Sequence, residues 1–356
     1  MDSGSRKLGV ALIGAGPFGN KRARAVAEHE RSRLVVVADS LPERAQALAE
    51  ECGCEVETDW RLAVARDDVQ AVIVSTPTPV LAEISLQAVR SGKHTLAEKP
   101  FGRSSEEVRT LAEAARAQGV HLKAGYNHRY HPAIRRAHEF CAQGAIGRPI
   151  SLRAIYGHGG RPGYEREWRT RLELSCGGEL MDQGVHILDL LRWFAGEFLE
   201  ATGMISTSFW PISPTEDNVC ALLRSKEGAL AELHASWTEW KNAFRFEVFG
   251  ERGYLRVNGL GGSYGLESLC LGVREKLGEA PREQLFEFPE PDESLLREWE
   301  AFASAVLDGN KMESDGRDAL RTMLLVEAIY QAARGGCTVR VSEEPTATPS
   351  RVTAAA

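Results

Sequence analysis

The sequence of 356 residues has no long hydrophobic run, no excess of positive charge and no paired cysteine motif. The apolar stretch near its start, residues 8–13, is far too short for a signal-peptide core or a membrane span. A net charge of −7 argues against a nucleic-acid-binding surface, which would show clustered lysine and arginine. We therefore expect neither a membrane nor a nucleic acid as a partner.

The cysteines are few and scattered. Seven are present, an odd number, and none forms the C-x-x-C spacing typical of a metal site. We predict a reduced, cytoplasmic protein that binds no metal. Hydrophobic residues make up 43% of the chain and charged residues 26%, as in an ordinary globular protein, and the length favours two domains.

Short apolar runs alternate with amphipathic stretches over the first third of the chain. The expected strands are residues 8–13, 34–38, 71–74, 94–97 and 121–124. The expected helices are residues 18–30, 42–51, 81–90 and 105–118. Because continuously apolar strands alternate with helices, this pattern predicts a doubly wound parallel sheet, an α/β Rossmann domain over residues 1–125.

The regular alternation of strands and helices ends after residue 125. The expected elements are a helix at 132–143, a strand at 150–156, a helix at 178–194, and strands at 199–209, 218–225, 229–237, 244–250 and 253–258. Consecutive strands without helices between them predict an α+β domain over residues 126–342 with an open, mainly antiparallel sheet. We expect late helices at 295–307 and 317–334 to pack back across both domains, a short strand within 337–341, and a disordered tail over 343–356.

A glycine-rich loop, Gly14-Ala15-Gly16-Pro17-Phe18-Gly19, directly follows the first strand and opens the first helix. Gly14 permits a tight turn, Gly16 lets a pyrophosphate approach the backbone, and Gly19 lets the helix pack closely on the sheet. Asp39 ends the second strand, where its carboxylate is placed to bind the adenosine ribose hydroxyls and to repel a 2′-phosphate. The pattern therefore predicts NAD as cofactor, although Arg44 nearby keeps NADP open.

Two further places carry residues suited to proton and hydride chemistry. Lys99 follows the fourth strand, at the carboxyl edge where doubly wound sheets place ligands, and can hydrogen-bond a substrate hydroxyl there. Asp182 and His186 stand four residues apart in a helical pattern, so they are expected to share one helix face. Such a pair can orient an imidazole for proton transfer near neutral pH.

Several segments, in this order, resemble the family of glucose-fructose oxidoreductase, inositol dehydrogenase and rhizopine-catabolism proteins, usually written Gfo/Idh/MocA. The matching pieces are the glycine loop, Ser75-Thr76-Pro77, Ser91 to Pro100, Gly125 to Tyr130, and the segment of Asp182 and His186. One position departs from the family pattern, because Leu81 stands where a histidine is common. This departure puts the local packing of the cofactor in doubt.

The resemblance implies a Rossmann domain joined to a sheet whose cleft face receives a sugar, a cyclitol or a sugar nucleotide. It implies that Lys99, Asp182 and His186 form the reaction centre, with Asn127 and Arg129 beside the nicotinamide and the substrate. An exposed sheet face in this family often makes homodimers or homotetramers. The residues implied on the cofactor side, besides the glycine loop and Asp39, are Thr76, Pro77, Glu98 and Lys99.

Oxidising a secondary alcohol requires a base within reach of its hydroxyl while hydride leaves the carbon. We assign His186 as this acid/base, Lys99 to polarising the oxygen, and Asp182 to holding the imidazole and the substrate. Lys99 as the base remains the alternative. Two other functions stay open: a redox-neutral epimerase or lyase that oxidises transiently, and a non-catalytic NAD/sugar-binding sensor.

The loop at residues 157–171 offers four arginines and a tryptophan ahead of the Asp182 helix. Arginines bind phosphate and tryptophan stacks on sugars, so a phosphorylated or nucleotide-linked sugar is conceivable. A solvated loop, partly neutralised by its two glutamates, is the other interpretation. The further substrate-binding candidates are Tyr156, His158, Trp168 and Arg169.

Overall fold

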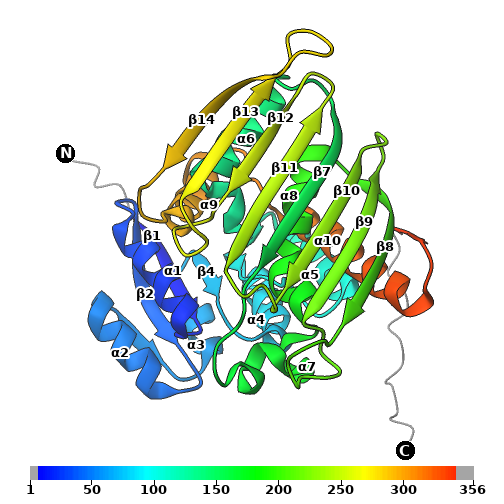
Figure 1. Cartoon of the computed structure of the whole chain (residues 1–356). Coiled ribbons are helices and arrows are strands. Elements are labelled where there is room, and N and C mark those ends of the chain that lie inside the picture. The colour runs from blue at the N-terminus through cyan, green and yellow to red at the C-terminus, as the bar shows by residue number, and fades with distance from the viewer. Residues whose placement is uncertain (1–6, 342–356) are drawn as a thin grey trace, which may run out of the picture.

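The computed structural model describes residues 7–341, so the expected tail at 343–356 lies outside the described residues. Within that range the chain forms a six-stranded parallel sheet and a nine-stranded mixed sheet, with helices around and between them (Figure 1). The expected fold class, an α/β Rossmann domain joined to an α+β domain with an open, mainly antiparallel sheet, is confirmed.

The first sheet has the strand order β3-β2-β1-β4-β5-β6, and all neighbours are parallel. Its strands are β1 (Leu8–Ile13), β2 (Ser32–Ala38), β3 (Glu55–Glu57), β4 (Ala71–Val74), β5 (His94–Ala97) and β6 (Leu122–Ala124). Its helices are α1 (Pro17–Glu28), α2 (Pro42–Cys52), α3 (Trp60–Ala65), α4 (Thr78–Arg90) and α5 (Ser105–Gln118). The strand order reverses between β1 and β4, so the carboxyl ends of these two strands mark the ligand crevice of such a sheet.

The sequence pattern did not reveal β3 and α3. β3 has three residues, two of them glutamate, and α3 has six residues capped by Asp59, whose side chain accepts a hydrogen bond from the Arg61 N–H. Both elements are too short to show a hydrophobic period, and this is why they were missed.

The second sheet has the order β14-β13-β12-β11-β7-β10-β9-β8-β15, and within the described chain only the β7–β10 pair is parallel. Its strands are β7 (Pro149–Gly157), β8 (Phe198–Ser206), β9 (Asn218–Ser225), β10 (Leu230–Ser236), β11 (Ala243–Gly250), β12 (Gly253–Asn258), β13 (Glu267–Val273), β14 (Arg282–Phe288) and β15 (Val339–Arg340). The expected strands are present, whereas β13 and β14 were not foreseen. The side chains of β14 are mostly exposed, so this strand lacks a clear apolar alternation.

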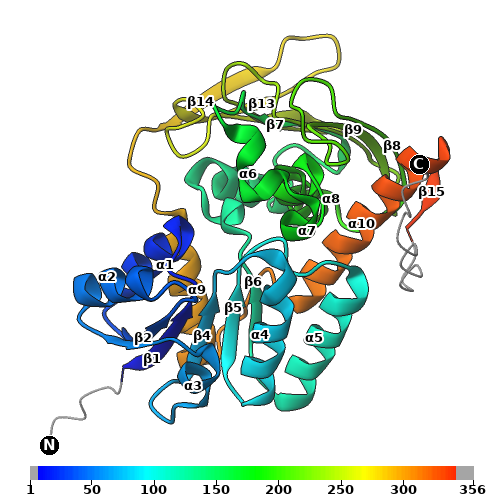
Figure 2. The same ribbon diagram turned by 90° about the horizontal axis from the view of Figure 1, so that it is seen from below.

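Helices α6 (Pro132–Ala142), α7 (Leu172–Ser175) and α8 (Val185–Ala195) form a layer between this sheet and the first domain (Figure 2). Three short helical segments, η1 (Asn127–Tyr130), η2 (Tyr164–Arg166) and η3 (Trp168–Thr170), belong to the connections. The single helix expected at 178–194 is divided: Leu180–Gly184, labelled η4, is a π-helical turn, and α8 follows it. This turn carries Asp182, and His186 lies in the first turn of α8.

Of the two late helices, α9 (Ser294–Asp308) lies on the first domain, whereas α10 (Gly316–Gly335) reaches from the second sheet to the first domain. α9 packs against α1, and α10 packs against α5 and against β8. A buried ion network holds α9 in place: the Arg22 Nε donates to Glu98 Oε1 at 2.6 Å, and Arg22 Nη1 lies 2.7 Å from Glu298 Oε2. None of the helices in residues 7–341 combines the length and the apolar character needed to cross a membrane.

Candidate active site

In the glycine loop between β1 and α1, Gly14 and Gly19 lie too close to other backbone atoms to carry a side chain, whereas Gly16 faces open space. Gly14 has a φ of +98°, and a side chain there would clash with the Ser75 backbone, while a side chain at Gly19 would clash with the Gly14 carbonyl. At Gly16, by contrast, no described atom beyond its own chain neighbours lies within 4 Å of the position a Cβ would take. Gly16 is the N-cap of α1, which has no side-chain cap and no acidic residue in its first turn. The positive helix end therefore faces open space, as binding of a pyrophosphate requires.

Asp39 lies at the end of β2, beside this loop. Its Oδ2 accepts a hydrogen bond from the Ala15 N–H at 2.7 Å, and its Oδ1 accepts one from the Leu41 N–H at 2.9 Å. The carboxylate thus fixes the glycine loop and stands at the position that suits a ribose contact. Pro17 and Phe18 form the first turn of α1, where the Phe18 side chain is exposed.

The other residues expected on the cofactor side follow β4 and β5. Thr76 lies beside Gly14, and its buried hydroxyl has no hydrogen-bond partner among the described residues; Pro77 is the N-cap of α4. Glu98 is engaged in the network with Arg22, and its pKa is raised by burial, against the opposing effect of the Arg22 guanidinium. Pro77 is exposed and the Thr76 hydroxyl is buried but unpaired in the described chain, whereas Glu98 first serves to hold α1 against β5.

Lys99 and Asp182 meet across the two domains. Lys99 follows β5, and its Nζ donates to Asp182 Oδ1 at 2.8 Å and to the Asp182 carbonyl oxygen at 2.5 Å. The two side chains keep exposed fractions of 15% and 17%. The pair therefore joins the carboxyl end of β5 in the first sheet to η4, and both side chains remain partly exposed to solvent.

A second cation faces Asp182. Arg169 Nε lies 3.3 Å from Asp182 Oδ2, and Arg169 Nη1 donates to Glu167 Oε2 at 2.5 Å. Burial alone would raise the pKa of Asp182, but Lys99 and Arg169, with a smaller effect of His158, bring it down to about 2. Asp182 is therefore a carboxylate throughout the neutral range.

His186 lies near Lys99, but Asp182 does not hold it, which corrects the expectation from their spacing. No hydrogen bond joins the two side chains in residues 7–341, and the Nδ1 of His186 is buried without a partner. The Asp182 carboxylate is instead engaged by two cations, with Lys99 Nζ at 2.8 Å and Arg169 Nε at 3.3 Å. Burial lowers the pKa of His186 well below its ordinary value, and Lys99 lowers it further, so the imidazole is neutral.

The ring of His186 stacks on His128, a contact that the sequence did not predict. The ring centroids are 3.8 Å apart and the planes differ by 14°. His131 meets His128 edge-on at 5.5 Å, and the His131 Nδ1 lies 3.1 Å from Glu267 Oε2. Gly125 to Tyr130 had been singled out as a segment, but no spacing in it indicates that His128 reaches a residue nearly sixty positions away.

Arg129 and Asn127, both expected beside the substrate, have their polar atoms committed to the protein. Arg129 is 3% exposed; its Nε and Nη2 donate to the carboxylate of Asp189 at 2.7 and 2.5 Å, and its Nη1 lies 3.2 Å from Asp318. Asn127 Nδ2 donates to Ser294 Oγ at 2.8 Å. These contacts point to packing roles.

The remaining substrate-binding candidates form two groups, one around His128 and one around Arg169. Tyr156, near the end of β7, has its ring 5.2 Å from that of His128. His158 Nδ1 accepts a hydrogen bond from the Gly160 N–H at 3.0 Å, and burial lowers the pKa of His158. Trp168 is 42% exposed, and the Arg169 guanidinium lies 5.3 Å from its ring centroid. Tyr156 thus belongs with the histidine stack, and Trp168 belongs with Arg169.

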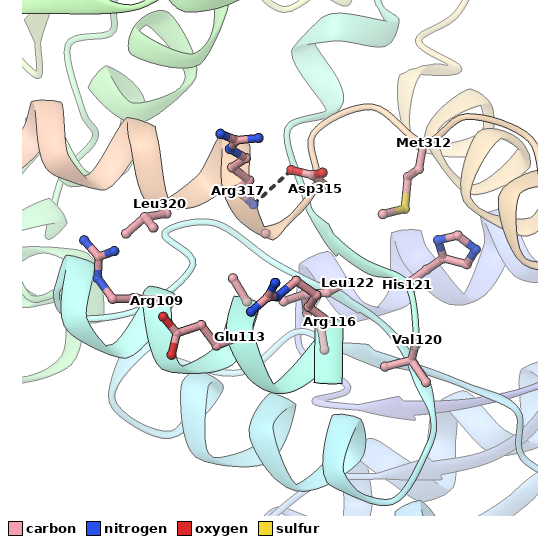
Figure 3. Close-up of a pocket in the computed structure, with 13 residues that line it drawn as sticks. Arg109, Glu113, Arg116, Val120, His121, Leu122, Met312, Asp315, Arg317 and Leu320 are labelled. Carbon is pink, nitrogen blue, oxygen red and sulfur yellow. Dashed lines mark hydrogen bonds between the residues drawn. The ribbon is translucent and has the colours of Figure 1, made fainter. Parts of the chain in front are cut away.

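A cavity of about 510 Å³ lies elsewhere, between α5 and the start of α10. Figure 3 shows the residues that line it, Arg109 and Arg116 on α5 and Arg317 at the start of α10 among them. None of the candidate site residues lines this cavity. It is therefore separate from the Lys99–Asp182 centre.

Two family models match the chain, one for each sheet. The oxidoreductase family with an NAD-binding Rossmann fold matches residues 8–126, and the GFO/IDH/MocA C-terminal domain matches residues 134–256. The chain therefore belongs to the Gfo/Idh/MocA family of oxidoreductases. Its first domain is an NAD-binding Rossmann domain, which agrees with the open cradle at Gly16 and with the expected cofactor.

Similar proteins share almost the whole length of the chain. Levoglucosan dehydrogenase of Pseudarthrobacter phenanthrenivorans is 26% identical, with 92% of this chain and 96% of the relative covered. Inositol 2-dehydrogenase of Rhizobium meliloti is 26% identical, with 90% and 95% covered. The structure of a levoglucosan dehydrogenase with NADH and levoglucosan has a TM-score of 0.88 at 24% identity, with 95% of this chain and 100% of that chain covered. A protein from gentamicin A biosynthesis, solved with NAD, has a TM-score of 0.82 at 27% identity, with 95% and 97% covered.

Proposed function

We propose that the protein is an NAD-dependent oxidoreductase that moves hydride between nicotinamide and a secondary hydroxyl, or the corresponding ketone, of a sugar or cyclitol. The observation that carries the proposal is the Lys99–Asp182 ion pair, which joins the NAD-binding domain to the second domain beside a neutral His186. The names of relatives, levoglucosan dehydrogenase and inositol 2-dehydrogenase among them, support this substrate class.

The nicotinamide accepts the hydride, whereas side chains of the protein take up the proton and stabilise charge on the reacting oxygen. Lys99, oriented by Asp182, donates a hydrogen bond to the reacting oxygen and stabilises its developing negative charge. His186, neutral because it is buried beside Lys99, takes the proton from the hydroxyl. The ion pair favours this division of roles, because a lysine held by a carboxylate is a better donor than acceptor.

The contacts of the arginine-rich loop favour an uncharged substrate over a phosphorylated one. Glu167 binds Arg161 at 2.6 Å and Arg169 at 2.5 Å, so this carboxylate offsets one of their two positive charges. Arg169 also faces Asp182. Trp168 offers an exposed ring face on which a sugar can stack. We infer that this loop positions a free sugar or cyclitol through hydroxyl contacts and stacking.

A redox-neutral use of the same site is the second candidate. A relative named 2,7-anhydro-N-acetylneuraminate hydratase, from Mediterraneibacter gnavus, is 28% identical over 301 residues, with 82% of this chain covered. In such a reaction, hydride taken from the substrate returns to it, so no reduced cofactor accumulates. Tightly retained cofactor with conversion of the sugar and no net NADH would favour this candidate.

The outer face of the second sheet is proposed to join copies of the chain. Met204 and Leu222 are exposed on it, at 80% and 59%, and the paired charges of Glu247 and Arg256 lie on the same face, separated from β9 by β10 and β7. An exposed apolar and charged sheet face suits a self-complementary contact. Light scattering on the purified protein tests whether it is a homodimer, a homotetramer or neither.

A screen of inositols, free sugars and anhydrosugars with NAD and with NADP, followed by absorbance of the reduced nicotinamide, tests the main proposal. Wild type is expected to reduce NAD with at least one of them. Lys99→Met is expected to lose turnover while its affinity for NAD, measured by calorimetry, stays within about threefold of wild type. Equal turnover by Lys99→Met would refute the assigned role.

A further inference from the structure

The orientation of His186 has no hydrogen-bonded cause in the described structure. Its Nδ1 is buried and unpartnered, and the carboxylate of Asp182 is committed to Lys99 and Arg169. In most His-dependent sites a carboxylate or carbonyl on Nδ1 fixes the ring. Something else must hold this imidazole.

The rings around His186 supply that constraint. His128 lies parallel to it at 3.8 Å between centroids, and Tyr126 meets it edge-on at 6.1 Å. Another parallel stack, His138 on Trp193 at 3.6 Å and 4°, joins α6 to the later part of α8. The parallel stack on His128 is therefore the close contact that fixes the plane of His186.

We propose that His128 is the positioning residue of His186, a stacking platform that replaces the missing carboxylate. The proposal rests on the proposed function, in which His186 accepts the substrate proton. It assigns to His128 no contact with substrate or cofactor. His128 acts by fixing the plane of the His186 ring and by covering one face of it against water.

His128 is itself held firmly. Its Nδ1 is 3.3 Å from the Asn127 Oδ1, and Asn127 in turn donates to Ser294 at the start of α9. The ring of Tyr156 packs on it at 5.2 Å and the ring of His131 at 5.5 Å. The platform is thus fixed from η1, from β7 and from the late helix that packs on the first domain.

The groups that face His186 explain why a neutral platform suits it. Lys99 after β5, Arg22 on α1 and His131 after η1 all disfavour a positive charge on the ring. A stacked neutral imidazole adds no further positive charge beside the ring of His186. The stack therefore covers the ring without adding to the repulsion from these cations.

Two substitutions of His128 separate stacking from mere space filling. His128→Phe keeps an aromatic face, whereas His128→Leu keeps apolar bulk without one. The matched control is His138→Leu, which breaks the stack of His138 on Trp193. We expect kcat of His128→Leu to fall on the order of 10- to 100-fold with little change in KM, because a ring that is free to tilt loses its attack geometry. His128→Phe is expected to stay within about threefold of wild type, and His138→Leu within about twofold.

The pH dependence of kcat/KM distinguishes loss of the platform from a general packing defect, which would leave the pKa of His186 unchanged. Loss of the platform admits water to His186, so the pKa of His186 is expected to rise toward its ordinary value and the acidic limb of kcat/KM to move to higher pH in His128→Leu. The same rise is measured without substrate by NMR titration of the histidine ring protons. An unshifted His186 titration in folded His128→Leu, or equal losses of kcat in the Phe and Leu variants, overturns the proposal. If wild type reduces no cofactor with any sugar, the proposed function fails, while the NMR titration still tests the platform.

Discussion

Gly16 and Gly19 give the sharpest test of the cofactor site, because the structure explains the absence of a side chain differently at each position. A Cβ at Gly16 would meet no described atom beyond its own chain neighbours within 4 Å, whereas a Cβ at Gly19 would clash with the Gly14 carbonyl. We therefore expect Gly16→Ala to damage cofactor binding and to spare the fold. Gly19→Ala is expected to damage the fold itself.

The magnitudes follow from these surroundings. Gly16 has an extended backbone with φ of −69°, which alanine adopts freely, so Gly16→Ala should change the free energy of unfolding by less than about 0.5 kcal/mol. A methyl group in the space left for the pyrophosphate should weaken NAD binding about 10- to 100-fold, or about 1.4–2.7 kcal/mol. At Gly19 the obstacle is a backbone oxygen that cannot rotate away, so overpacking should cost about 1–3 kcal/mol of stability.

Calorimetric titration with NAD and thermal unfolding without ligand measure the two effects separately. Gly19→Ala should lower the Tm by several degrees, about 2–4 °C per kcal/mol for a domain larger than about 150 residues. Wild-type affinity for NAD in Gly16→Ala would refute the assignment of this space to the cofactor. A Tm loss in Gly16→Ala equal to that in Gly19→Ala would refute the structural argument.

Three further predictions concern charged groups. Asp39→Ala should raise the affinity for NADP relative to NAD because a carboxylate that repels a 2′-phosphate is removed; an unchanged Kd ratio would contradict this. Arg22→Met should lower the free energy of unfolding in urea by about 3–5 kcal/mol, since it removes the hydrogen-bonded cation of the buried Glu98 and leaves Glu298 with Lys123 alone, 3.7 Å away, and a loss below 1 kcal/mol would show the network to be dispensable. The pKa of Asp182 is lowered from 3.8 to about 2, so its carboxylate stabilises the fold above pH 4 and loses this effect as the pH falls toward 2. The advantage of wild type over Asp182→Asn in urea unfolding, about 2 kcal/mol at pH 6 from that shift, should therefore shrink toward pH 2, and a difference independent of pH would rule out the ion pair as its source.

The parallel sheet was predictable because each of its long strands is a continuous apolar run between helices. β1 is buried along its entire length, and its sequence shows it directly. The glycine loop was also predictable from the sequence, because the strand and the helix that it joins determine which of its positions must be glycine. Short or exposed elements such as β3 and β14 carry no such signal.

The candidate site was predictable as a set of residues and less so as a set of contacts. Lys99 and Asp182 were expected in one centre, and the structure joins them by a hydrogen bond. The π-helical turn could not be read from spacing, because a regular helix and a turn with one extra residue share the same local sequence pattern. The stack of His128 on His186 depends on two distant segments meeting, which periodicity does not encode.

Arg129 shows the opposite case, a conspicuous residue with a structural task. Its guanidinium is nearly inaccessible and binds Asp189 through two hydrogen bonds, so it is bound to the protein interior before any ligand arrives. A cation in a motif cannot be assigned to substrate or to packing from sequence, because both uses require the same side chain.

Direct hydride transfer tests the proposed function most closely. A sugar or cyclitol that the protein oxidises, labelled with deuterium at the reacting carbon, should deliver that deuterium to C4 of the nicotinamide in a single turnover, as read by mass spectrometry of the cofactor. Wild type should show the transfer, while His186→Asn and Lys99→Met should bind NAD and show almost none. Deuterium absent from the nicotinamide in wild type, or transferred at the wild-type rate by both variants, would contradict the assignment of Lys99 and His186 to the reaction centre.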